Sequence, residues 1–194
     1  MQFLFVAERT RRLRTAGERC IITAIFRWDC MAEAKKKVYV ETSVVSNLTA
    51  RRSYNLIDAA RQAATQTWWD TMRCEFDLFV SLLVIDEASK GDSEASRKRL
   101  EALKEMSVVT ITREMEVLAE RLLEATAVPR SSYEDAVHIA AATVGRMDYL
   151  LTWNCKHIAN AITMPKIFKV CNDSGYQCPI ICTPEQLGKE ENDE

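Results

Sequence analysis

Apolar and polar residues change their spacing repeatedly along the chain, and each change marks a predicted element. Runs rich in β-branched and apolar residues predict four strands, in the segments 37–41, 107–112, 148–153 and 179–183. Apolar residues at helical spacing predict helices over 56–73, 94–104, 113–128 and 131–145, with a further helix from His157. The apolar run FVSLLVI passes directly into a helix-like stretch before Gly91. Strands and helices therefore alternate along most of the chain.

The helix over 131–145 has the clearest start and end. Ser131 is followed three residues later by Glu134, a spacing typical of a capping box in which side-chain oxygens accept hydrogen bonds from the first amide groups. This spacing places Asp135 in the first turns of the helix. Gly145 marks the expected carboxyl-terminal end.

Alternating strands and helices predict an α/β fold with a small, mainly parallel sheet flanked by helices. In such folds, functional groups gather at the carboxyl ends of strands and at the starts of the following helices. Glu41 and Asn154 occupy predicted strand ends, Asp135 lies at a helix start, and Glu87 follows the FVSLLVI run. Carboxylates gathered at one edge repel one another unless they are protonated or bridged by a hard cation such as Mg2+ or Mn2+. The sequence therefore predicts a metal site at this edge.

Composition limits the possible partners and the number of domains. The chain has 194 residues, of which 47% are hydrophobic, enough for one ordinary core. A formal net charge of −2 gives no overall basic surface, so contact with nucleic acid would be local or carried by metal ions. The seven cysteines form no CxxC pair, and an odd number cannot all pair within one chain. We therefore expect reduced thiols in a cytoplasmic protein.

The two ends of the chain differ from its body. Residues 1–30 are arginine-rich, and Met31 is a natural start just before the first strand, so we expect 1–30 to be an extension outside the fold. An amphipathic or RNA-binding arm is the alternative interpretation of these residues. Residues 31–188 form the predicted domain, and 189–194 are an acidic, solvated tail. No apolar run approaches the ~20 residues that a membrane-spanning helix needs, so no membrane partner is expected.

Four segments taken in order resemble the PIN-domain family, and more narrowly the VapC-like toxins of bacterial toxin–antitoxin pairs. The segments are VYVETSVVSNL, LLVIDEASKGD, YEDAVHIAAA and YLLTWNCKHIANA, and the resemblance covers roughly 38–187. It implies a PIN-like fold and a metal-dependent ribonuclease with three or four acidic residues at the sheet edge. It also implies an RNA substrate, a cognate antitoxin protein and a homodimer.

Carried over by position, the four family acids fall on Glu41, Glu87, Asp135 and Asn154. Glu41 stands where the family usually has Asp, and it keeps the charge on a longer stem. Asn154 removes a charge but keeps a carbonyl oxygen that can ligate a cation or hold a water. The hydroxyl residues that follow Glu41, which are Thr42 and Ser43, are expected to orient Glu41 or a metal-bound water.

The activity implied is metal-assisted hydrolysis of an RNA phosphodiester, in which one or two Mg2+ or Mn2+ ions activate water and neutralise charge on the phosphate. The alternative is a PIN-fold module that binds RNA or protein and has lost catalysis through its altered acid set. An aspartyl-phosphate phosphatase is disfavoured, because the first strand ends in ETS and lacks paired aspartates.

Several residues near these positions have competing interpretations. Asp86, next to Glu87, could be the inward carboxylate, although Glu87 matches the family position. His138 lies one turn after Asp135 and could act as a general base, but the favoured interpretation is a histidine on the buried face of its helix. Trp153 is assigned to the core and Lys156 to the surface. The cysteines and His157 do not reproduce the spacing of a structural zinc site.

Overall fold

The structure is a computed structural model that describes residues 34–188, and it contains one five-stranded sheet in the order β3-β2-β1-β4-β5. The strands are β1 (Lys36–Val40), β2 (Phe76–Ser81), β3 (Ser107–Val109), β4 (Tyr149–Leu151) and β5 (Ile180–Cys182). All neighbouring strands pair in parallel. The prediction of a mainly parallel α/β fold is thus confirmed. The extension 1–30 and the tail 189–194 lie outside the described residues.

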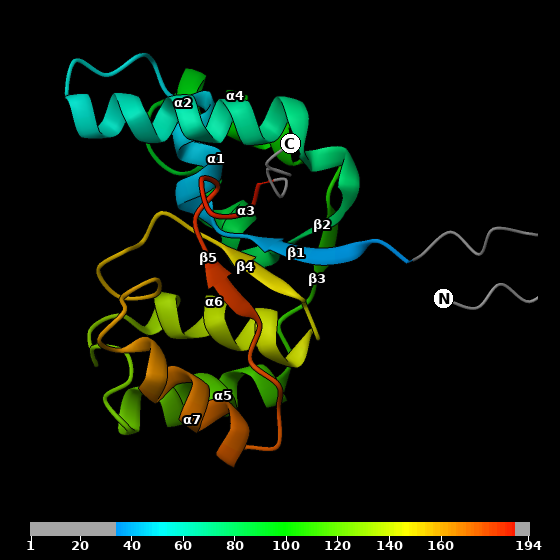
Figure 1. Cartoon of the computed structure of the whole chain (residues 1–194), viewed down its shortest axis with the longest axis vertical. Helices are drawn as coiled ribbons and strands as arrows, with labels where there is room; N and C mark the ends of the chain where they lie inside the picture. Colours follow the sequence, from blue (N-terminus) through cyan, green and yellow to red (C-terminus); the bar gives the residue numbers. More distant parts are fainter. Residues whose placement is uncertain (1–33, 189–194) are drawn as a thin grey trace, which may run out of the picture. The chain divides into compact units, whose positions relative to one another are not determined.

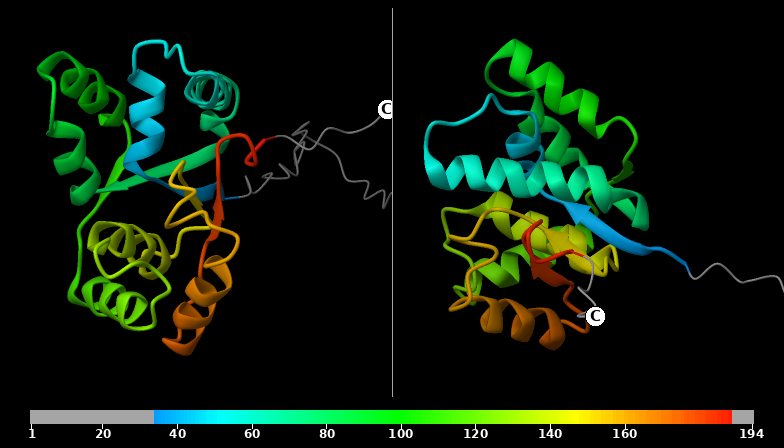
Figure 2. Two further views of the ribbon diagram at one scale, coloured as in Figure 1. Left: turned by 90° about the vertical axis from the view of Figure 1, so that its left-hand side faces the viewer. Right: turned by 45° about the horizontal axis from the view of Figure 1, so that its top comes forward.

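Helices cover both faces of the sheet. They are α1 (Thr42–Thr49), α2 (Leu56–Thr71), α3 (Leu82–Ser89), α4 (Ser93–Leu103), α5 (Arg113–Glu124), α6 (Tyr133–Val144) and α7 (Met164–Asp173), with a 3-10 turn, η1, at Arg73–Glu75. Helices α1 to α4 lie on one side of the sheet and α5 to α7 on the other (Figures 1 and 2). Burial on both faces explains why Val38, Tyr39 and Val40 of the central strand are fully inaccessible to solvent. Within residues 34–188, every helix is too short or too polar to cross a membrane.

The predicted boundaries hold where a strong local signal sets them. The first strand ends at Val40, one residue before Glu41, as its polar continuation indicates. Helix α5 begins at Arg113, and Gly145 follows the last residue of α6 as its C-cap. The segment 179–183 contains β5, as predicted.

Three local predictions need correction. The FVSLLVI run contains the last three residues of a strand, β2, which passes into α3 at Ser81 without a loop, so the apolar pattern hides the boundary. No helix begins at His157, because the chain turns there and α7 begins at Met164, where Pro165 is compatible with a first turn. The capping box at Ser131 does not form: the N-cap of α6 is Ser132, and its side chain makes no capping bond.

The strand register brings the ends of three strands together. Val40 of β1 pairs with Leu151 of β4, and the amide of Glu41 donates to the carbonyl of Leu151 at 3.0 Å. On the other side, Tyr39 of β1 pairs with Phe79 of β2, two residues before that strand ends. The residues that follow β1 and β4, and the helix that follows β2, therefore meet at the carboxyl edge of the sheet.

Candidate metal centre

Glu41 lies at the junction between the central strand and α1, where it is the N-cap of the helix. Its carboxylate accepts a hydrogen bond from the amide of Ser43 at 3.1 Å and a second one from the Ser43 hydroxyl. The Thr152 hydroxyl at the end of β4 donates a third, at 2.7 Å. The residue is only 6% exposed, and among residues 34–188 it has no salt bridge to a basic side chain. A buried carboxylate is thus held by neutral donors alone.

Glu87 approaches the same place from α3. Its Oε2 atom accepts a hydrogen bond from the Thr42 hydroxyl and lies 3.2 Å from Nε2 of His138. Burial opposes the charged form of Glu87, but the hydrogen bond and charge of His138, together with Thr42, outweigh it and lower the pKa of the carboxyl below its usual range. The neighbouring Asp86 side chain is 61% exposed and pairs with Lys90 at 2.7 Å. Helical phase therefore directs Glu87, and not Asp86, toward the sheet edge.

His138, on α6, is buried as predicted for a core histidine, but both of its ring nitrogens contact polar groups. Nε2 faces Glu87, and Nδ1 lies 2.9 Å from the hydroxyl of Tyr39, which in turn lies 2.7 Å from the Ser81 hydroxyl. Burial disfavours the charged ring, yet the hydrogen bond to Glu87 and the surrounding carboxylates raise the pKa of His138 above its usual value. Its position three residues after Asp135 places the two side chains on the same face of α6, and this spacing was the sequence signal that His138 lies near a predicted acid.

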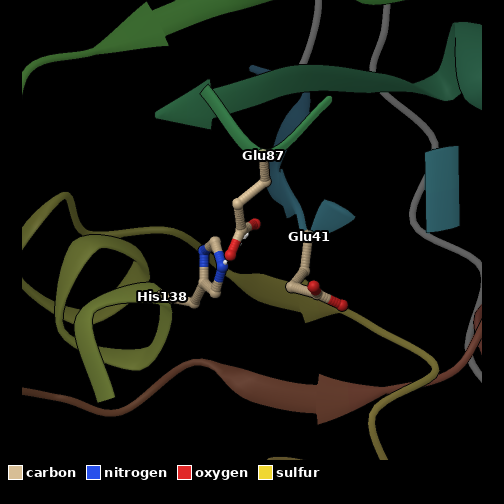
Figure 3. Close-up of side chains that lie close together, drawn as sticks. All are labelled: Glu41, Glu87 and His138. Atoms are coloured by element: carbon tan, nitrogen blue, oxygen red, sulfur yellow. Dashed lines mark hydrogen bonds and ion pairs between the residues drawn. The ribbon is translucent and has the colours of Figure 1, made fainter. Parts of the chain in front are cut away.

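Together these three residues form a compact group of possible metal ligands. One ligand atom from each of Glu41, Glu87 and His138 lies within 4.8 Å of the others. Figure 3 shows Glu87 and His138 pointing toward each other, with the Glu41 carboxylate beside them. Two carboxylates and one imidazole are a donor set that divalent cations accept. The residues present therefore fit a bound divalent ion.

Asp135 and Asn154 meet each other rather than joining that group directly. Nδ2 of Asn154 donates to Oδ1 of Asp135 at 2.8 Å, and His157 Nδ1 lies 2.7 Å from Oδ2. The same ring nitrogen lies 3.1 Å from the hydroxyl of Ser132, which explains why this serine does not cap α6. Thr152 joins the two parts of the site, because its hydroxyl donates a hydrogen bond to Glu41 and accepts one from the backbone amide of Asn154 at 2.9 Å.

The orientation of the Asn154 amide is fixed by its partners. Its Oδ1 atom accepts from the backbone amide of His157 at 3.0 Å, while Nδ2 faces the Asp135 carboxylate. A flipped amide would place a donor against a donor and an acceptor against a carboxylate. The carbonyl oxygen that was expected to face a cation is thus engaged by the backbone. Of the two hydroxyl residues expected to orient Glu41, Ser43 does so, whereas Thr42 donates to Glu87.

Comparison with solved structures places this fold among known ones. The VapBC2 complex of Rickettsia felis, bound to a DNA fragment from its promoter, contains a chain that matches 76% of this chain and 98% of its own length, with 12% identity and a TM-score of 0.50. The chain has a VapC-like PIN fold. A second match is Mycobacterium tuberculosis VapC20, a toxin that cleaves the sarcin-ricin loop, with 16% identity and a TM-score of 0.48 over 64% of this chain and 95% of its own. No family model matches this sequence, and no curated protein matches it.

Proposed function

We propose that the protein is a metal-dependent endoribonuclease and the toxin of a toxin–antitoxin pair. The observation that carries this proposal is the convergence of Glu41 and Glu87 with His138 at the carboxyl edge of the parallel sheet. These residues come from three separate elements, and a purely structural role gives no reason to place the partly exposed Glu87 carboxylate beside the buried one of Glu41. The VapC-like fold supports the same class of activity.

Each residue of the site takes a role that its contacts suggest. Glu41 and Glu87 hold a divalent cation such as Mg2+ or Mn2+, and hydrogen bonds from Ser43, Thr152 and Thr42 fix the directions of their carboxylates. A bound cation would lower the pKa of water and neutralise charge on the RNA phosphate.

Asp135 contributes the third carboxylate of the proposed site. Asn154 acts on it as a neutral donor, because its amide nitrogen holds Asp135 and its oxygen is engaged by the backbone. With this position neutral, a second cation should bind more weakly than in a relative with four carboxylates, so a higher metal concentration is expected for activity.

The alternative function is a PIN-fold module that binds RNA or protein without cutting it. It is favoured by one observation: Asp135 has a partner on each oxygen, namely Asn154 and His157. A carboxylate satisfied in this way can be a structural feature alone. The two functions differ in whether RNA is cleaved when the cation is supplied.

The partners of the proposed toxin are an RNA substrate, a cognate antitoxin and a second copy of the chain, acting in the cytoplasm. A chain of the VapBC2 structure, which is bound to a DNA fragment from its promoter, shares the fold. Induced expression in a bacterium tests the antitoxin: growth should stop with the wild type and continue with Glu87→Gln. Co-expression of the protein encoded beside it should restore growth.

The nuclease is tested most sharply with neighbouring variants on α3. Purified wild type, Glu87→Gln and Asp86→Asn are incubated with a mixed RNA sample in EDTA, Mg2+ or Mn2+. Glu87→Gln removes a charge from the proposed site, whereas Asp86→Asn removes one from an exposed ion pair on the next residue. Metal-dependent cleavage that persists only in wild type and Asp86→Asn is the expected result. Cleavage that survives in EDTA, or equally in Glu87→Gln, contradicts the proposal.

A further inference from the structure

A chain of three buried polar groups ends at the candidate metal centre, and the roles given above do not use it. Ser81, at the end of β2, contacts the Tyr39 hydroxyl at 2.7 Å, and Tyr39 contacts Nδ1 of His138 at 2.9 Å. Tyr39 and Ser81 are both inaccessible to solvent. The amide of Val84 also donates to the Ser81 hydroxyl, at 3.4 Å. A tyrosine hydroxyl held by a buried serine is therefore placed to accept a hydrogen bond from the imidazole Nδ1–H on the side away from the carboxylates.

This arrangement matches the way metal-binding histidines are held in proteins. A ligating histidine usually donates its second ring N–H to an oxygen acceptor, which fixes the tautomer and the direction of the ring. When Nδ1–H donates to Tyr39, and Tyr39 donates to Ser81, the lone pair of Nε2 faces Glu87 and Glu41. The relay thus offers Nδ1–H an acceptor for the state in which a cation replaces the proton that Nε2 shares with Glu87.

The distance between the nearest two ligand atoms also fits one shared ion. His138 Nε2 and Glu87 Oε2 are 3.2 Å apart. Two ligands that each lie about 2.0–2.2 Å from one ion are separated by roughly 3–3.4 Å at octahedral or tetrahedral angles. The imidazole and the carboxylate can therefore share an ion without a rearrangement of the helices that carry them.

We propose that His138 is a nitrogen ligand held in place by the Tyr39–Ser81 relay, and that this site consequently prefers nitrogen-binding cations such as Zn2+, Co2+ or Fe2+ to Mg2+. The inference rests on the proposed metal site and deepens it by naming the class of cation. Imidazole suits these transition metals, whereas Mg2+ favours a set of oxygen ligands alone. Binding requires Nε2 without a proton, and that proton passes to solvent.

The test exploits the fact that the whole chain has only two histidines. The 15N-labelled full-length protein is titrated with Zn2+, which is diamagnetic, and the imidazole nitrogens are followed by long-range 1H–15N NMR. A His157→Gln variant assigns the two rings. We expect Zn2+ to shift Nε2 of His138 to the value of a metal-bound nitrogen while Nδ1 keeps its proton. No shift of His138 at saturating Zn2+, or a shift of His157 alone, overturns the proposal.

Two variants give an independent measurement of the same inference by calorimetry with Zn2+ and Mg2+. His138→Gln replaces the nitrogen ligand by an amide, and we expect the affinity for Zn2+ to fall at least roughly 100-fold while that for Mg2+ changes little. Tyr39→Phe removes only the acceptor of the relay, and we expect a loss of roughly 10-fold for Zn2+. Equal losses for both cations contradict the proposal.

RNA cleavage measured on the same samples separates this inference from the proposed function. If Zn2+ binds His138 but no cation supports RNA cleavage, His138 is a nitrogen ligand and the proposed nuclease activity is refuted. If Mg2+ or Mn2+ supports cleavage but Zn2+ does not change the His138 nitrogens, the protein is a nuclease and the role of His138 as a nitrogen ligand is refuted.

Discussion

Replacing Asn154 by Asp adds a carboxylate beside Asp135, and the structure predicts that this change destabilises the metal-free protein. The amide nitrogen that donates to Asp135 at 2.8 Å becomes a carboxylate oxygen at the same place. Losing a hydrogen bond to a charged group costs about 1.5–3 kcal/mol. Two like charges 4 Å apart repel by about 4 kcal/mol at an effective dielectric constant of about 20.

An N–H at Nδ1 of the His157 ring, which lies 2.7 Å from Oδ2 of Asp135, can still donate to that carboxylate and offsets part of the repulsion. We therefore expect a net loss of about 2–4 kcal/mol for Asn154→Asp. For a protein of this size, such a loss lowers the melting temperature by roughly 5–15 °C. Asn154→Ala is the matched control, because it removes the donor without adding a charge and should lose less.

The assay is thermal unfolding followed by circular dichroism at pH 7, in EDTA and in Mn2+. A cation that binds the new carboxylate pair stabilises the folded state by about 2.7 kcal/mol at one hundred times its dissociation constant. Mn2+ should therefore raise the melting temperature of Asn154→Asp more than that of wild type. Two results would refute the proposed pairing of Asp135 with position 154. Either Asn154→Asp and Asn154→Ala have the same melting temperature in EDTA, or Mn2+ raises the melting temperature of Asn154→Asp no more than that of wild type.

Three further changes test the site and the core. Ser43→Ala removes a hydroxyl donor to Glu41, so it should lower the free energy of unfolding by about 1.5–3 kcal/mol in urea titrations and weaken cation binding. A change within experimental error would show that the serine does not hold the carboxylate. The pKa of His138 is raised on folding, so protonated His138 stabilises the fold fully below the unfolded value of about 6.5, and this stabilisation is lost as pH rises through the folded value. The pKa of Glu87 is lowered on folding, so the stabilisation from its carboxylate is lost as pH falls through its folded value. The melting temperature in EDTA should thus fall as pH rises from 6 toward 9 in wild type but not in His138→Gln, and parallel curves would contradict the ion pair. Leu150→Ala, in the fully buried centre of β4, should cost about 2–5 kcal/mol in the same urea titrations without changing the acids, and a smaller loss would mean that this strand is not at the core.

Local patterns in the sequence were sufficient for most of the fold. The end of β1 could be predicted because Glu41 interrupts an apolar run, and α5 because its apolar residues share one face. The boundary between β2 and α3 was missed because the residues from Leu78 to Ile85 are all apolar except Ser81. No turn residue marks that boundary, so only the tertiary structure separates the two elements.

The site depended more on contacts between distant residues, and these have no local signature. Ser131 has the spacing of a capping residue, yet α6 begins after Ser132, whose hydroxyl contacts a histidine 25 positions away. Helical phase distinguishes Glu87 from Asp86 only when the direction of the sheet edge is known. His138 was assigned to the core because its helix face is buried, but burial and contact with a carboxylate are compatible when Tyr39 satisfies the other ring nitrogen.

The most direct test of the central claim is a calorimetric titration of Mn2+ into the full-length protein, with RNA cleavage measured on the same samples. We expect the wild type to bind Mn2+, Glu41→Gln and Glu87→Gln to abolish both binding and cleavage, and Asp86→Asn to retain both. Absence of Mn2+ binding to the wild type, or cleavage that persists when Glu41 and Glu87 are both neutralised, would contradict the central claim.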